Sequence, residues 1–231
     1  MNDYNYKLET YLFSIIKKIK NPIILELGVQ KGRSTIKFLE LCKNNNGKLF
    51  SVDVDDCSSV SNDENWNFYQ TRDDNFKFIK SKIPNKIDIL FIDSLHEADH
   101  VEKLITNYYS LIKKNGYIFI DDISHLPYLK NKDRNNFYCE INNKETFELL
   151  LTIYSENTSN FDLNFSFFSS GLAIIKKKND NKLISYKKLY ERRYNFKNIL
   201  RKLWKKIKKK VNFFYAIYGG WWCRKKLNNN C

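Results

Sequence analysis

Short apolar runs alternate with stretches of helical periodicity through the first half of the chain. The runs cover residues 22–28, 48–53, 67–70, 86–93 and 117–121. Most are followed by glycine, an acid or a polar turn, as expected where a buried strand ends. Strands that alternate with helices form βαβ units, so we expect an α/β fold with a Rossmann-like, doubly wound, mostly parallel sheet.

Helical and extended patterns also occur on both sides of this region. Residues 4–20 and residues 145–154 carry apolar side chains at helical spacing. Residues 161–168 and 171–176 have the pattern of two strands around a Ser-Ser-Gly turn. They predict a C-terminal antiparallel hairpin that completes the sheet.

The last part of the chain has a different composition. Residues 179–231 carry 16 of the 40 Lys and Arg but 2 of the 26 Asp and Glu, so residues 1–178 carry 24 of each. Within 182–218, apolar side chains recur at steps of three and four with basic side chains between them. We therefore expect a Rossmann-like domain over 1–178 and a tail over 179–231 that contains a basic amphipathic helix. The apolar positions are Phe196, Leu200, Leu203, Ile207, Val211 and Phe214.

The concentrated positive charge of this tail indicates an anionic partner. Residues 182–226 are expected to bind either an anionic membrane surface or nucleic acid. A third alternative is that the apolar stripe packs on the body of the protein or on a second copy of the chain in a homodimer. The aromatic stretch 211–222 is shorter than the roughly 20 apolar residues of a spanning helix. With no secretion signal in the first residues, we expect a cytoplasmic protein, with peripheral membrane attachment as an alternative.

Two glycines flank the turn after the first predicted strand. Gly28 and Gly32 allow a ligand to approach the backbone, and the amides of the helix that begins near Ser34 can donate to it. Glu26 is expected either to organise this turn or to accept from a ligand ammonium, and Asp53 is placed to bind ribose hydroxyls. A generic βα turn with a solvated aspartate is the alternative. A dinucleotide fingerprint would need a third glycine.

Three acids close the fourth and fifth predicted strands. Asp93, Asp121 and Asp122 are expected to converge, because the ends of adjacent parallel strands lie at one edge of the sheet. Three carboxylates with open positions suit Mg²⁺, which would bind and acidify a substrate hydroxyl. The alternative is that these acids cap helices or line a pocket without metal.

His96 follows Asp93 by three residues in the loop over the same edge. An imidazole titrates near neutral pH and is suited to take a proton from a hydroxyl nucleophile. We therefore name His96 and Asp93 as the candidate catalytic residues. A surface or capping histidine is the alternative.

Four motifs occur in a characteristic order. They are Glu-Leu-Gly-Val-Gln-Lys-Gly-Arg-Ser-Thr at 26–35, a strand-end acid at Asp53, Phe-Ile-Asp-Ser-Leu-His at 91–96 and Asn-Gly-Tyr-Ile-Phe-Ile-Asp-Asp at 115–122. Together they resemble class I methyltransferases of the family grouped with cephalosporin-hydroxylase-like and macrolide or sugar O-methyltransferases. The resemblance covers residues 20–178 and not the tail. Ser94 and Asn115 stand where the family usually has glycine.

The resemblance implies S-adenosylmethionine as cofactor and transfer of its methyl group to a hydroxyl of a small molecule or glycan, with metal assistance through the three acids. It also places Asp73 and Asp74, which follow the third strand, near the adenine, with a solvated loop as the alternative. The alternative is a nucleic-acid methyltransferase, or a non-catalytic binding module, that uses the tail. The expected cofactor-binding residues are Glu26, Gly28, Gly32, Ser34, Asp53, Asp74 and Asp93.

Overall fold

A computed structural model describes residues 3–125, 137–187, 189, 196–205 and 207. The chain divides into two compact units, Met1–Lys188 and Leu189–Cys231. The first unit thus extends beyond the predicted boundary at residue 178. The reason is that residues after the last strand pack against the body: the Asn157 side chain accepts from the backbone amide of Ile184 at 2.8 Å, and the Tyr186 hydroxyl donates to Glu102.

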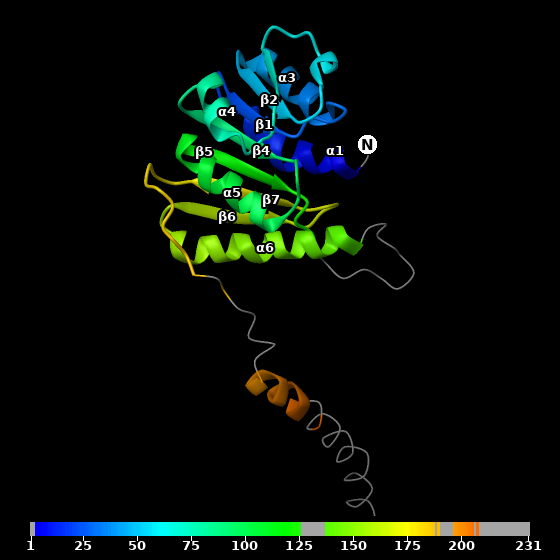
Figure 1. Cartoon of the computed structure of the whole chain (residues 1–231), viewed down its shortest axis with the longest axis vertical. Coiled ribbons are helices and arrows are strands. Elements are labelled where there is room, and N and C mark those ends of the chain that lie inside the picture. The colour runs from blue at the N-terminus through cyan, green and yellow to red at the C-terminus, as the bar shows by residue number, and fades with distance from the viewer. Residues whose placement is uncertain (1–2, 126–136, 188, 190–195, 206, 208–231) are drawn as a thin grey trace, which may run out of the picture. The chain divides into compact units, whose positions relative to one another are not determined.

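The first unit is built on a seven-stranded sheet in the order β3-β2-β1-β4-β5-β7-β6 (Figure 1). β1 to β5 pair in parallel, whereas β7 is antiparallel to both β5 and β6. The predicted α/β class, the mostly parallel sheet and the C-terminal antiparallel hairpin are therefore confirmed. The strands are β1 (Ile23–Leu27), β2 (Lys48–Asp53), β3 (Trp66–Gln70), β4 (Ile87–Ile92), β5 (Ile112–Asp121), β6 (Phe161–Ser166) and β7 (Leu172–Lys177).

Helices cover both faces of the sheet, because alternate strand residues point to opposite faces. Ile24 packs with the N-terminal helix and α3 on one face, and Leu25 packs with α4, α5 and α6 on the other. The principal helices are α1 (Asp3–Leu8), α2 (Ser14–Ile16), α3 (Arg33–Asn45), α4 (Phe76–Lys82), α5 (Ala98–Tyr108) and α6 (Phe137–Asn157). Short helical turns are η1 (Glu9–Phe13), η2 (Ser58–Val60) and η3 (Tyr109–Leu111).

The N-terminal helix is one element in three parts, with the wide turn η1 between α1 and α2. Leu8, Leu12 and Ile16 are fully buried on one side of it, as the helical spacing predicts. They pack with Phe38 of α3 and Phe91 of β4. The helix ends at Ile16, earlier than the predicted residue 20, and its first turns lie next to the carboxyl ends of β4 and β5 (Figure 1).

In the second unit, residues 196–205 and 207 are helical. Residues 182–187, which the sequence pattern assigns to the same helix, are irregular and belong to the first unit. The remainder of the predicted helix, 208–218, and of the predicted binding segment, 208–226, lies outside the described residues. Among the described residues, no helix has the length and apolar character needed to cross a membrane.

Candidate active site

A cavity of about 760 Å³ opens at the carboxyl ends of the parallel strands. It lies where the strand order reverses between β1 and β4, the place at which doubly wound sheets bind ligands. Its walls come from the β1–α3 turn, the ends of β2 and β4, the loop before α5 and the end of β5. The polar residues that the sequence places at these strand ends are thus brought to one site.

Gly28 makes the close approach between the β1 end and the β4 end possible. Its φ of +99° is a backbone conformation that side chains disfavour, and a Cβ there would lie 2.1 Å from the Asp93 carbonyl oxygen. Gly32 has a φ of +71° and precedes α3, and a Cβ there would lie 2.2 Å from Val60. Both glycines are required by the fold of the turn, and Gly28 and Ser34 line the cavity.

Glu26 is fully buried beneath this turn, and it is not among the residues that line the cavity. Its carboxylate accepts hydrogen bonds from Ser34 at 2.6 Å, Thr35 at 2.8 Å and Ser51 at 2.7 Å. Burial raises the pKa of Glu26 to about 7, although these three hydroxyl donors oppose the shift. Of the two predicted roles, these hydrogen bonds support the first, in which Glu26 organises the turn. The contact of Glu26 with a ligand stays a prediction.

Asp53 lines the cavity and connects the β2 end to the β1–α3 turn. Its Oδ2 accepts from the backbone amides of Val29 at 2.7 Å and Gln30 at 3.0 Å, and its Oδ1 accepts from Asp55 at 3.0 Å. Burial alone would raise the pKa of Asp53, but the amide donors outweigh burial and lower it. Asp53 is thus an ionised carboxylate at the cavity wall, as the sequence predicts.

The loop after β3 presents Asp73 to the cavity and turns Asp74 away from it. Asp74 pairs instead with Arg72 at 3.0 Å and Lys103 at 2.8 Å, and it is not among the residues that line the cavity. Asp73 accepts from Ser94 at 2.5 Å and contacts His100 at 2.9 Å. Burial acts to raise the pKa of Asp73, but these two partners lower it.

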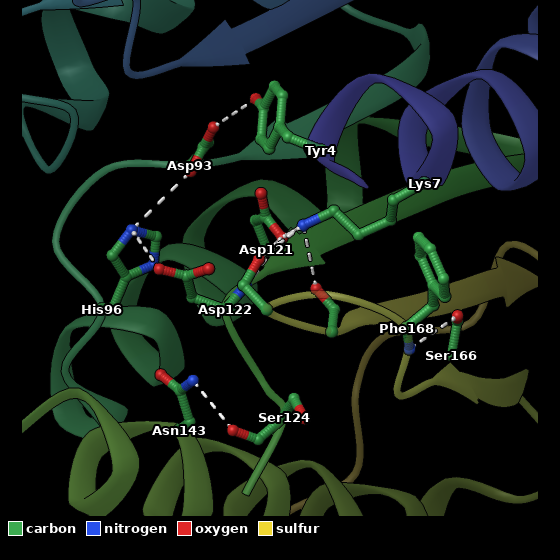
Figure 2. A network of polar contacts seen from close by, with 12 residues as sticks. Tyr4, Lys7, Asp93, His96, Asp121, Asp122, Ser124, Asn143, Ser166 and Phe168 are labelled. Atoms are coloured by element: carbon green, nitrogen blue, oxygen red, sulfur yellow. Dashed lines mark hydrogen bonds and ion pairs between the residues drawn. The ribbon is translucent and has the colours of Figure 1, made fainter. Parts of the chain in front are cut away.

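Asp93 directly follows β4 and Asp121 ends β5, and both receive contacts from the N-terminal helix (Figure 2). The Tyr4 hydroxyl donates to Asp93 Oδ2 at 2.9 Å, and the Lys7 ammonium forms a buried ion pair with Asp121 Oδ1. Burial and the neighbouring Asp121 raise the pKa of Asp93. Burial also raises the pKa of Asp121, although Lys7 opposes that shift.

His96 lies between two of the predicted acids, as Figure 2 shows. Its Nε2 is 3.4 Å from Asp122 Oδ2 and 3.6 Å from Asp93 Oδ1, distances of ion pairs and not of tight hydrogen bonds. The imidazole is partly exposed and lines the cavity. Asp122 has a φ of +57°, which is uncommon outside glycine and marks a backbone held by its surroundings. His96 therefore has access to the cavity and carboxylates on two sides.

Residues 25–123 match the model of a family described as a methyltransferase domain. This segment is a methyltransferase domain. It runs from the middle of β1 to just past β5 and contains every residue of the cavity wall except Tyr4. A comparison with curated protein sequences finds no match.

Three solved structures share the fold of the methyltransferase domain. A methyltransferase of Podospora anserina, PaMTH1, bound to SAH, is 15% identical over 72% of this chain and 76% of its own, with a TM-score of 0.58. A Staphylococcus aureus protein assigned as a caffeoyl-CoA O-methyltransferase is 16% identical over 77% and 84%, with a TM-score of 0.56.

The third structure is MycE, the methyltransferase of the mycinamycin biosynthetic pathway, in complex with Mg and SAH. It is 18% identical over 77% of this chain and 49% of its own, with a TM-score of 0.53. The chain thus spans about half of MycE. The family match and this fold confirm the predicted resemblance to class I methyltransferases.

The three acids of the methyltransferase domain do not form the predicted metal site. Among the described residues, no group of three or more His, Cys, Asp or Glu side chains is arranged to hold a metal ion. Asp121 faces the Lys7 ammonium, Asp93 accepts from Tyr4, and Asp122 faces His96. The ligand set that would suit Mg²⁺ is already engaged by protein donors, so the residues present do not fit the ion.

Two residues of the site carry no signal in the sequence. Tyr4 and Lys7 reach it from the N-terminal helix, whereas Ser94, which belongs to the 91–96 motif, and His100 line the cavity and contact Asp73. The helical spacing around Leu8 could have identified Lys7 as a position on the buried face, but not its partner.

Proposed function

We propose that this protein transfers the methyl group of S-adenosylmethionine to a hydroxyl of a small molecule or carbohydrate. The proposal rests on one arrangement. A single cavity joins a glycine turn with a strand-end carboxylate to a histidine flanked by two further carboxylates. The names of PaMTH1 and MycE, which include bound SAH, support the cofactor, and that of the Staphylococcus aureus protein supports the oxygen acceptor.

In this proposal the β1–α3 turn and Asp53 bind the cofactor. Gly28 lets the β1 end approach the Asp93 backbone at the cavity wall, and the amides of the first turn of α3 can donate to a ligand at that end of the helix. Asp53 is ionised and lies at the β2 end, where a carboxylate accepts from both ribose hydroxyls. A ribose bound there would compete with the backbone amides of Val29 and Gln30 for hydrogen bonds to the Asp53 carboxylate.

The acceptor hydroxyl would lie next to His96. In an in-line displacement, the hydroxyl oxygen forms a bond to the methyl carbon as the bond from that carbon to the sulfonium sulfur breaks. The hydroxyl proton passes to the imidazole of His96, and S-adenosylhomocysteine leaves with the sulfur electron pair. Asp93 and Asp122, at 3.6 and 3.4 Å, stabilise the imidazolium that results.

Calorimetric titration of the full chain with S-adenosylmethionine and S-adenosylhomocysteine tests the cofactor assignment. We expect saturable binding to the wild type and at least about tenfold weaker binding to Asp53→Ala, because one charge-assisted contact contributes roughly 1.5 kcal/mol or more. Lys37→Ala, on the exposed side of α3, is the matched control and should bind as the wild type does. A wild type that binds neither compound would refute the proposal.

A second measurement tests His96. Release of S-adenosylhomocysteine is followed with a panel of hydroxyl-bearing small molecules and glycans. For an acceptor that supports turnover, His96→Asn should lower the rate by roughly 100-fold, while cofactor affinity stays within about twofold of the wild type. An unchanged rate would remove His96 from the mechanism.

We propose further that the second unit attaches the protein to an anionic lipid surface. The described helix exposes apolar side chains, among them Leu200, Leu203 and Trp204, next to Lys197 and Arg201. A basic helix that also exposes a large apolar area is suited to the membrane interface, whereas phosphate binding by nucleic acid requires only the charges.

Co-sedimentation of the full chain with vesicles containing phosphatidylserine tests this attachment. The double variant Leu200→Ser, Leu203→Ser keeps every charge and should lose most of the bound fraction. Binding that is unaffected by this variant, together with salt-sensitive retardation of RNA in a gel shift, would overturn the membrane assignment in favour of nucleic acid.

A further inference from the structure

One helical turn of α1 carries two polar side chains onto the acids at the ends of β4 and β5 (Figure 2). Tyr4 donates to Asp93 Oδ2 at 2.9 Å, and Lys7 pairs with Asp121 Oδ1. The two side chains also contact each other, with the Lys7 ammonium 5.0 Å from the centre of the Tyr4 ring. Residues three apart on a helix share a face, so α1 presents both groups to the site together.

The Lys7 ammonium is completely enclosed. Its side chain has no exposed surface, and the partner carboxyl of Asp121 is 1% exposed. Besides Asp121, the ammonium donates to Ser170 Oγ at 2.7 Å and to the Gly171 carbonyl oxygen at 3.3 Å. All three of its donors therefore have acceptors in the protein, which is what a buried ammonium requires.

Two of the three acids lie in a setting that requires a positive charge. Asp121 is buried, Asp93 is partly buried, and the two carboxyl groups lie at the ends of adjacent parallel strands. Ionised carboxylates in such surroundings need a cation nearby, from a bound ion or from the protein. Lys7 supplies that cation from a helix that precedes Asp121 by 114 residues in the chain. Its ammonium pairs with the carboxylate that a metal ion would need as a ligand.

We propose that Lys7 is the resident cation of this site and takes the place of a divalent ion on Asp121, with Tyr4 closing Asp93 to such an ion from the same helix. This inference rests on the proposed methyl transfer. It says that the reaction needs no divalent ion, because the Lys7 ammonium balances the charge of the acids. Lys7 and Tyr4 are positioning residues, since both act through the acids next to His96.

This arrangement determines what the third acid does. Asp122 is the most exposed of the three acids and faces His96 at 3.4 Å, not a shared ion. The backbone amide of Asp122 also donates to Asp121 Oδ1 at 2.8 Å, so Lys7 and this amide hold the same oxygen. By fixing Asp121, Lys7 fixes the backbone that aims Asp122 at the imidazole.

The test is a titration of the full-length protein with Mn²⁺, with the bound ion followed by electron paramagnetic resonance. Wild type, Lys7→Met and the control Lys17→Met, an exposed lysine at the end of the same helical segment, are compared. We expect no saturable binding to wild type or control up to roughly 1 mM Mn²⁺, the weak end of protein sites for hard ions. Lys7→Met should bind one Mn²⁺ ion with a dissociation constant at least about tenfold below this limit of roughly 1 mM, because its three acids are left without the ammonium.

Two results would overturn the proposal. One is saturable binding of Mn²⁺ to the wild type that Asp121→Asn abolishes, since Lys7 would then not exclude the ion. The other is a folded Lys7→Met protein that gains no affinity for Mn²⁺. If Lys7→Met does not fold, the wild type and Asp121→Asn titrations decide the question by themselves.

Cofactor calorimetry separates this proposal from the proposed function. S-adenosylmethionine should bind the wild type equally well with EDTA and with Mg²⁺. Failure to bind under both conditions would refute the methyltransferase proposal and leave the Mn²⁺ titrations as the measure of what Lys7 does. Binding that requires Mg²⁺ would refute only the proposed role of Lys7 and would leave the methyltransferase proposal standing.

Discussion

Replacement of Glu26 by glutamine should abolish a large pH dependence of stability. In the folded protein the pKa of Glu26 is about 7, against 4.5 for the free side chain. The folded state therefore holds a proton that the unfolded state releases between these two pH values. Stability is highest below pH 4.5 as far as this group is concerned, and it is lost as the pH rises toward 7.

The size of this effect follows from the two pKa values. Each unit of difference corresponds to about 1.4 kcal/mol, so the full shift is worth roughly 3 kcal/mol. Between pH 5 and pH 8 the wild type should lose roughly 2 to 3 kcal/mol of unfolding free energy through Glu26. Glutamine is neutral at both pH values and keeps an oxygen acceptor, and the hydroxyls of Ser34, Thr35 and Ser51 can reorient toward its amide.

Urea unfolding at pH 5 and pH 8 measures the effect for wild type and Glu26→Gln. The contributions of other titrating groups, including Asp93 and Asp121, are common to both proteins and cancel in the comparison. The difference between the two proteins should change by roughly 2 to 3 kcal/mol across this range, in favour of the variant at pH 8. An equal pH dependence in both would show that Glu26 is ionised throughout and that burial is not the main influence on its pKa.

Two further substitutions test the cavity walls. Gly28→Ala should lower stability by about 2 kcal/mol or more and weaken S-adenosylmethionine binding, because its Cβ would lie 2.1 Å from a backbone oxygen; calorimetry at wild-type affinity would contradict this reasoning. Asp73→Asn should lose roughly 1 to 3 kcal/mol at pH 7 in urea unfolding, because His100 and Ser94 stabilise the ionised carboxylate. Since the folded pKa of Asp73 is lowered, this deficit should shrink as the pH falls below 3.8, and a deficit constant down to pH 3 would refute the ionic explanation.

The sequence was sufficient to predict where the site lies. Most of the apolar runs are followed by glycine, an acid or a polar turn, and parallel strands bring their carboxyl ends to one edge, so the sequence predicts Gly28, Asp53 and His96 at a common cavity. The position of Glu26 also has a local cause. Side chains alternate along β1, and Glu26 shares a face with Ile24, which packs with α3, so it points to the α3 hydroxyls of Ser34 and Thr35.

Other features of the site depend on contacts that no local pattern encodes. Asp73 and Asp74 are neighbours in a polar loop, and only the backbone conformation decides that the first faces the cavity and the second pairs with Lys103. The pairing of Lys7 with Asp121 joins residues that are 114 positions apart in the chain. A lysine next to a buried leucine looks like one more solvated charge, and the convergence of three strand-end acids, taken without Lys7, predicts a metal ion.

The same ion pair has a consequence for the order in which the protein is made. Lys7 is synthesised first, yet its acceptors lie 114, 163 and 164 residues later in the chain. Until these later residues have been synthesised, the Lys7 ammonium has none of its acceptors, and the apolar face of the N-terminal helix lacks partners such as Phe91. Contacts between such distant residues form late, because closing a long loop costs entropy before any contact compensates for it. The N-terminal helix therefore completes the site only after the turn before β7 has been translated, and a shortened chain that stops before this turn would leave Lys7 without two of its three acceptors.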